Sequence, residues 1–149
     1  MSRKRCLTEA TPSDSKLTGT WAGGGAGRGT SVTSSGVGKL KEDEACQFLE
    51  AMGYRVVERN FRTRTGEIDI VARLGETLVF VEVRYRREGC LVTAAESVTA
   101  RKAWRIRSAV ERYLAVRRIP DGTPVRIDLC IVRDDRESSE VVASIIETG

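Results

Sequence analysis

The stretch GEIDIVARLGETLVFVEVRYR, residues 66–86, decides the fold of this chain. Its apolar residues first alternate with polar ones and then run together, a pattern typical of half-buried and buried strands. It predicts one strand over residues 66–74 and another over 77–86, joined by a turn at Leu74-Gly75-Glu76. Because so short a turn connects strands that run in opposite directions, we expect the two to be antiparallel neighbours.

The second strand carries charged residues into an apolar run. Side chains alternate between the two faces of a strand, so the residues of each face can be read from the sequence. One face holds Phe80, Glu82, Arg84 and Arg86, and the other holds Val79, Val81, Val83 and Tyr85. An acid such as Glu82 is costly inside a sheet unless it has a partner.

Asp69 is embedded in the same way, between Ile68 and Ile70. Pairing around the turn brings Asp69 and Glu82 to the same end of the sheet. Two adjacent carboxylates repel each other and shift each other's pKa. A divalent cation removes this conflict, and oxygen ligands suit Mg²⁺ or Mn²⁺.

A third acid, Glu42, lies three and seven residues before Ala45 and Leu49, in line with the buried stripe of a predicted helix. We expect it to point toward the sheet. Three carboxylates and the Arg84 cation would then form a phosphoryl-transfer site. The metal would polarise the phosphate, and Arg84 would offset the charge that develops on it.

The remaining elements follow from periodicity and caps. A helical stripe is formed by Ala45, Phe48, Leu49 and Met52, with Glu42, Asp43 and Glu44 in the first turn and Gly53 at the end. A strand is predicted over residues 54–61. Thr99 caps a helix to about Arg117, with a stripe of Ala103, Ile106, Val110, Tyr113 and Leu114. Strands over residues 125–132 and 140–146 complete an α/β domain in the order α-β-β-β-α-β-β, over residues 38–149.

Residues 1–37 have a different composition, rich in Gly, Ser and Thr. Such a segment buries too little apolar surface to offset its ordering entropy, so we expect a disordered arm. The formal net charge of the whole chain is +4, and much of it lies on this arm. The overall charge is therefore weak evidence for binding to nucleic acid.

The composition excludes several classes of chemistry. A length of 149 residues allows one domain, and the chain has no histidine. Catalytic pairs that need an imidazole and histidine-ligated zinc sites are thus excluded. Of the four cysteines, Cys46 and Cys130 fall in apolar patterns and are expected in the core, without a zinc ribbon or disulfide framework. With no apolar run of membrane-spanning length and no signal-peptide core, we expect a soluble cytoplasmic protein without a membrane partner.

These motifs resemble a known bacterial family. The segments that carry the resemblance are Glu42 to Ala45, Gly53-Tyr54, Arg59 to Arg62, Gly66 to Asp69, Val79 to Arg84, Lys102 and Arg126 to Asp128. Over residues 38–134 the chain resembles the YraN family. That family is similar to the restriction-endonuclease-like PD-(D/E)xK superfamily, which includes the archaeal Holliday junction resolvases. The resemblance implies a restriction-endonuclease-like core, with a mixed central sheet flanked by helices.

The resemblance also implies roles for individual residues. Asp69 corresponds to the metal-binding Asp, Glu82 to the acid of the (D/E)xK motif, and Val83 to a backbone carbonyl ligand. Glu42 resembles the first-helix Glu of the resolvases. Arg84 stands where the family usually has Lys, and Lys41 where it usually has Gly. Arg keeps the positive charge but cannot deprotonate near neutral pH, so Arg84 can clamp a phosphate but cannot act as a general base.

The middle of the chain is rich in arginine, with ten cations against six acids over residues 62–107. Guanidinium groups suit phosphate oxygens. The candidate nucleic-acid contacts are Arg62, Arg64, Arg86 and Lys102.

The sequence therefore favours a metal-dependent endonuclease that acts on DNA, with branched DNA as one substrate class. A catalytically weak or inactive nucleic-acid-binding module on the same fold is the alternative. A purely structural interpretation also stays open, in which Asp69 and Glu82 pair with Arg84 or Arg62 and the partner is a protein. Because the resolvases work as dimers, a homodimer is open as well.

Overall fold

The computed structural model describes residues 16–18, 34–86, 98–133 and 139–142. Its strands form one mixed sheet in the order β1-β6-β5-β4-β3-β2, in which β4 and β5 are parallel and every other neighbouring pair is antiparallel. The strands are β1 (Lys16–Thr18), β2 (Arg55–Arg62), β3 (Glu67–Leu74), β4 (Thr77–Arg86), β5 (Val125–Arg133) and β6 (Glu140–Val142). The predicted α/β class and the order α-β-β-β-α-β-β are confirmed, and β1 is an additional edge strand.

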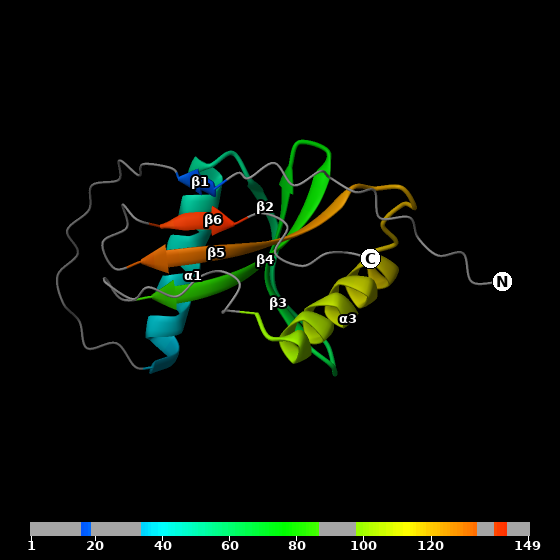
Figure 1. The fold of residues 1–149 in the computed structure, drawn as a ribbon, viewed down its shortest axis with the longest axis horizontal. Coiled ribbons are helices and arrows are strands. Elements are labelled where there is room, and N and C mark those ends of the chain that lie inside the picture. Colours follow the sequence, from blue (N-terminus) through cyan, green and yellow to red (C-terminus); the bar gives the residue numbers. More distant parts are fainter. Residues whose placement is uncertain (1–15, 19–33, 87–97, 134–138, 143–149) are drawn as a thin grey trace.

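Two helices, α1 (Ser34–Ala51) and α3 (Ala100–Val116), cover the two faces of this sheet. The alternation along β4 shows this directly. Val79 and Val81 belong to the apolar cluster beneath α1, whereas Leu78 and Phe80 belong to the cluster beneath α3. In Figure 1, α1 runs across β4, β5 and β6, and α3 lies in another part of the view beside β3.

Helix α3 forms as the sequence predicts. The side chain of Thr99 accepts a hydrogen bond from the backbone N–H of Lys102, the usual geometry of an N-cap. Of the predicted stripe, Ile106, Val110, Tyr113 and Leu114 are buried against the sheet, and Ala103 is partly buried beside them. The helix lies in the crossover that joins the parallel strands β4 and β5.

Helix α1 corrects one expectation. It begins at Ser34, so its first turn contains no acidic residue, and Glu42, Asp43 and Glu44 lie two turns further in. The glycines near its start weaken a helix by about 1 kcal/mol each, but a glycine keeps its N–H and C=O and does not interrupt the hydrogen-bond ladder. The three acids therefore do not interact with the helix N-terminus, and Glu42 and Asp43 pair with β2 instead.

Several predictions fall partly outside the described residues. Within the expected arm, Lys16–Thr18 pairs with β6, a pairing that the composition of the arm did not indicate. Residues 1–15 and 19–33 lie outside the described part of the chain. The other two cysteines, Cys6 and Cys90, lie outside it too, as does the strand predicted beyond Val142. Cys46 and Cys130 are free and buried, as expected. No helix in the described ranges is both long and apolar enough to cross a membrane.

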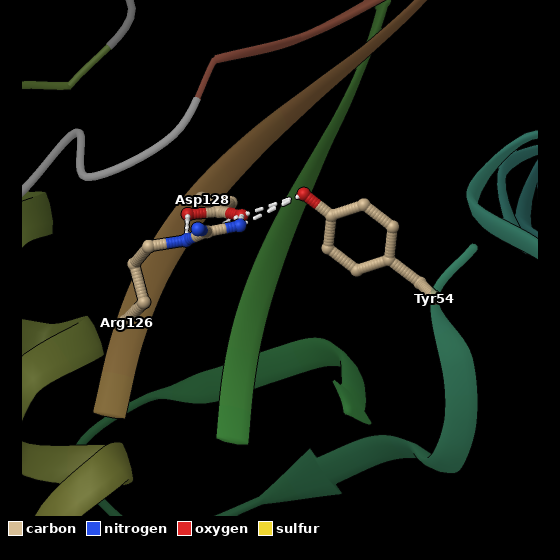
Figure 2. Close-up of polar contacts among 3 residues, drawn as sticks. All are labelled: Tyr54, Arg126 and Asp128. Atoms are coloured by element: carbon tan, nitrogen blue, oxygen red, sulfur yellow. Dashed lines mark hydrogen bonds and ion pairs between the residues drawn. The ribbon is translucent and has the colours of Figure 1, made fainter. Parts of the chain in front are cut away.

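A buried ion pair links β5 to the start of β2. Asp128 is fully buried, and both of its carboxylate oxygens accept hydrogen bonds from the guanidinium of Arg126, with distances of 2.8 Å to Oδ1 and 2.7 Å to Oδ2. The hydroxyl of Tyr54 donates to Asp128 Oδ2 over 3.0 Å and accepts from Arg126 (Figure 2). Tyr54 belongs to the apolar cluster beneath α1, so we assign this group to the packing of that side of the sheet, whereas Glu82 contacts Lys102 of α3 on the other side.

Candidate functional site

Strands β3 and β4 separate at one end, and the candidate site lies at this point of separation, called the parting below. The pairing of β3 with β4 ends at Ile70 opposite Val81. In contrast, β3 stays paired with β2 as far as Glu67, and β4 stays paired with β5 as far as Arg86. One step beyond that last pair, Asp69 Oδ2 accepts a hydrogen bond from the backbone N–H of Val83 over 2.8 Å. The Asp69 carboxylate thus takes the place of a backbone acceptor, and this fixes it against β4.

Glu82 lies at the same parting, on the side covered by α3. The residue is 4% exposed, and its Oε1 atom contacts Arg84 Nη1 at 2.8 Å and Lys102 Nζ at 2.6 Å. The partner expected from the sequence, Arg84, is therefore present, and Lys102 of α3 is a second one. The other expected partner, Arg62, contacts the exposed Glu67 at 3.7 Å instead.

The two acids influence each other electrostatically. The pKa of Asp69 rises from 3.8 to about 6, first because the carboxyl group is buried and then because the charge of Glu82 is close. The Val83 N–H and the Lys102 ammonium act in the opposite direction without cancelling the rise. The negative charge of ionised Asp69 is therefore not fully compensated by nearby cations, although Glu82 is paired with two of them.

Glu42, the third predicted acid, contacts residues of β2. Its carboxylate accepts a hydrogen bond from the Asn60 amide over 2.8 Å and lies 3.5 Å from Arg59 Nη2. Asn60 has a φ of +55°, a left-handed conformation that asparagine tolerates better than most residues. The β2–β3 register runs from Arg59 opposite Ile70 to Phe61 opposite Ile68, which places Asn60 across from Asp69. Glu42 thus contacts the residue of β2 that lies opposite Asp69 in the register of the sheet.

The direct acidic set consequently has two members. No group of three acidic or cysteine side chains in the described part of the chain could hold a metal ion. Val83, predicted as a carbonyl ligand, follows Glu82 directly in the chain and donates its N–H to Asp69.

A basic pocket of about 220 Å³ adjoins the pair. Its lining residues are Arg62, Thr63, Arg64, Gly66, Glu67, Lys102, Arg105 and Ile106. Three of the four predicted nucleic-acid contacts line it, and Lys102 joins it to Glu82. The fourth, Arg86, lies at the end of β4, where its guanidinium donates to the Tyr85 carbonyl.

The turn between β2 and β3 shapes this pocket. The Thr63 hydroxyl accepts hydrogen bonds from the N–H groups of Thr65 and Gly66 and donates to the Gly66 carbonyl. A Cβ at Gly66 would lie 2.5 Å from the carbonyl oxygen of Arg105, so only glycine lets α3 come this close. Gly66 therefore allows the turn to pack closely against α3.

Two residues of α3 were not predicted from the sequence to be functional. Arg105 lines the pocket, and Trp104 is 58% exposed. The signal available for Trp104 was its spacing. It falls outside the predicted apolar stripe of α3, and arginines lie three residues before and after it.

Comparison with known proteins confirms the resemblance drawn from the motifs. A family model described as "Uncharacterised protein family UPF0102", the YraN family, matches residues 41–132. A UPF0102 protein of Lachnoclostridium phytofermentans is 44% identical over 95 residues, which cover 64% of this chain and 80% of the relative. One from Roseiflexus castenholzii is 42% identical over 105 residues, covering 70% and 85%. One from Dechloromonas aromatica is 50% identical over 82 residues, covering 55% and 68%.

Proposed function

The chain belongs to the UPF0102 family, and from the geometry of its carboxylate pair we propose that it is a divalent-metal-dependent nuclease that hydrolyses phosphodiester bonds in DNA. One observation carries the proposal. Asp69 and Glu82 are held at the parting of β3 and β4, next to Arg84 and Lys102 and beside a pocket lined with cations.

The residues present fit a hard divalent cation. Mg²⁺ in phosphoryl-transfer sites is commonly held by one or two carboxylates and by substrate phosphate, and it keeps several waters. Asp69 and Glu82 supply this number of carboxylates, and the raised pKa of Asp69 means that a further positive charge would stabilise its ionised form. When bound, Mg²⁺ or Mn²⁺ would act as a Lewis acid on the phosphate and acidify a water molecule.

The cationic side chains supply the remaining electrostatics. In hydrolysis, a bond forms between phosphorus and a water oxygen, a phosphorus–oxygen ester bond breaks, and the leaving oxygen takes up a proton. Arg84 and Lys102 lie where they can offset the negative charge that grows on the phosphate oxygens. The Arg84 guanidinium and the Lys102 ammonium contact the same oxygen of Glu82.

Glu42 and Asn60 have a positioning role in this proposal. The Asn60 amide bridges between Glu42 and the strand position across from Asp69. This hydrogen bond ties β2 to α1 at the position across from Asp69, and so steadies the part of the sheet from which Asp69 reaches Val83.

Mn²⁺-dependent cleavage of labelled DNA, both linear and branched, tests the proposal. We expect the wild type to cleave and the variants Asp69→Asn and Glu82→Gln to lose at least about a hundredfold in rate, since each removes one of the two carboxylates. Glu76→Gln is the matched control, because Glu76 is exposed in the turn at the other end of the same two strands. Equal cleavage by wild type and Asp69→Asn, or no cleavage by folded wild type, would contradict the proposal.

A binding module that does not cleave is the second candidate, and one observation favours it. Glu82 Oε1 is already paired with two cations, so this acid has less need of a metal than Asp69. In that case the wild type would bind DNA with a steep salt dependence and would not cleave it, whatever the metal. Cleavage by Arg84→Lys alone would identify a nuclease that has lost its motif lysine.

A further inference from the structure

Trp104 occupies the solvent face of α3, between arginines. Its side chain is 58% exposed, while Ile106, Val110 and Tyr113 of the same helix are buried against the sheet. Residues three apart on a helix are surface neighbours, so Arg101 and Arg107, both exposed, lie on either side of the indole. The helix thus presents a large planar ring between two guanidinium groups.

This face is strongly positive and continuous with the basic pocket. Helix α3 carries five cationic residues and one acid, Glu111, and its first eight residues hold four of the cations and no acid. Arg105 follows Trp104 directly, and its side chain turns toward the pocket, where its Nε donates to the Thr65 carbonyl. Positive charge therefore extends from the indole to Lys102 and Glu82.

The chemistry of this surface fits one kind of partner. A single exposed apolar side chain needs no explanation, but an indole among arginines has the features of a stacking platform beside a phosphate-binding groove. A second copy of the chain docked through the same face would bring eight like charges together. An acidic peptide would use the arginines and leave the ring without a role.

Resting on the proposed function, we propose that Trp104, flanked by Arg101 and Arg107, stacks an unpaired nucleobase of the nucleic acid whose backbone enters the basic pocket. In a duplex the faces of the bases are covered by their neighbours, so this contact requires an unstacked base. The substrate is then a nucleic acid with a single-stranded segment next to the bond that is cut.

Binding without divalent metal tests the platform separately from cleavage. Fluorescence anisotropy in EDTA would compare a labelled 20-nucleotide oligothymidylate with a 20-base-pair duplex for wild type, Trp104→Ala and Trp104→Phe. We expect Trp104→Ala to weaken single-strand binding about tenfold to a hundredfold, Trp104→Phe to retain most of it, and duplex binding to change less. Val116→Ala removes another exposed apolar side chain of α3 and is expected to have no effect.

Intrinsic fluorescence provides an independent measurement. The chain has two tryptophans, so Trp21→Phe leaves Trp104 as the sole indole, and the oligothymidylate should quench its emission. Unchanged single-strand binding by Trp104→Ala, with Mn²⁺-dependent cleavage intact, overturns the platform alone. Loss of a dimer on Trp104→Ala, with single-strand affinity unchanged, also overturns it and assigns the face to contacts between copies. Trp104-dependent binding without any cleavage supports the platform and overturns the nuclease, and a wild type that binds no nucleic acid overturns both.

Discussion

At the scale of single residues, the raised pKa of the Asp69 carboxyl group has the largest consequences. Its pKa of about 6 in the folded chain lies above its ordinary value of 3.8 because of burial and the charge of Glu82. A carboxyl group whose pKa is raised on folding destabilises the protein when ionised. The penalty is absent below about pH 4, grows between pH 4 and 6, and is complete above pH 6.

Asp69→Asn is therefore expected to stabilise the metal-free protein at pH 7. The gain is about 1–3 kcal/mol, from a pKa rise of about two units. The amide oxygen of Asn can still accept the Val83 N–H, so the contact with β4 survives. Urea unfolding at pH 7 and at pH 4 measures the effect: the gain should vanish at pH 4. A loss of stability at pH 7 would contradict this account of the carboxyl group.

Glu82→Gln is expected to act in the opposite direction. It leaves Arg84 and Lys102, each about one-quarter to one-third exposed, without the carboxylate that pairs them. Because partial exposure lets water screen the remaining charges, the loss should be about 1–3 kcal/mol rather than the larger penalty of a fully buried pair. Urea unfolding of the two single variants, side by side at pH 7 in EDTA, should give changes of opposite sign. A gain in stability for Glu82→Gln would show that the pair is not held by these cations.

At the scale of elements, the sequence predicted most of the strands and the N-terminal cap of α3. The antiparallel turn at Gly75, the Thr99 cap and the alternation along β4 are all local patterns, and each was confirmed. The parting of β3 from β4 could not be predicted, because it depends on β3 remaining with β2 while β4 follows β5. The three-residue pairing of β1 with β6 has too few residues to show a pattern.

The contact between the β2–β3 turn and α3 can be tested at Gly66. Gly66→Ala would place a Cβ 2.5 Å from the Arg105 carbonyl oxygen, and since this atom is backbone, the turn or the helix must move. We expect a loss of about 1–3 kcal/mol in the free energy of unfolding, together with weaker DNA binding as the pocket opens. Gly75→Ala is the control. Nothing lies within 4 Å of a Cβ there, so it should cost only its left-handed strain, about 1 kcal/mol, and leave DNA binding unchanged. DNA binding by Gly66→Ala equal to that of the wild type would contradict the packing argument.

The buried group around Asp128 belongs to the same scale, because it joins β5 to the segment that follows α1. Asp128→Ala removes the partner of Arg126 and is expected to cost about 3–5 kcal/mol, whereas Tyr54→Phe removes one hydroxyl and should cost about 1–2 kcal/mol. Thermal or urea unfolding gives both values. If Tyr54→Phe folds normally but loses Mn²⁺ binding, the group is part of the functional site and the structural assignment is wrong.

At the scale of the whole molecule, the candidate site depends on three segments that are distant in sequence. The pattern of residues 66–86 predicted that Asp69 and Glu82 would meet, because strand alternation and a short turn determine it. The position of Lys102 on Glu82 depends on how the crossover helix lies over the sheet, and periodicity gives its buried face but not its docking. The pairing of Glu42 with Asn60 likewise requires the left-handed residue in β2.

Isothermal titration of the metal-free wild type with Mn²⁺ at pH 7, beside Asp69→Asn, examines the central claim most directly. The claim is that Asp69 and Glu82, where β3 and β4 separate, form a binding site for a divalent cation. We expect one binding event in the wild type, and repeating the titration at pH 6, where about half of Asp69 is protonated, should add a measurable release of protons. Asp69→Asn should lose this event and Glu76→Gln should retain it. Binding of equal strength to wild type and Asp69→Asn, or none to the folded wild type, would contradict the account.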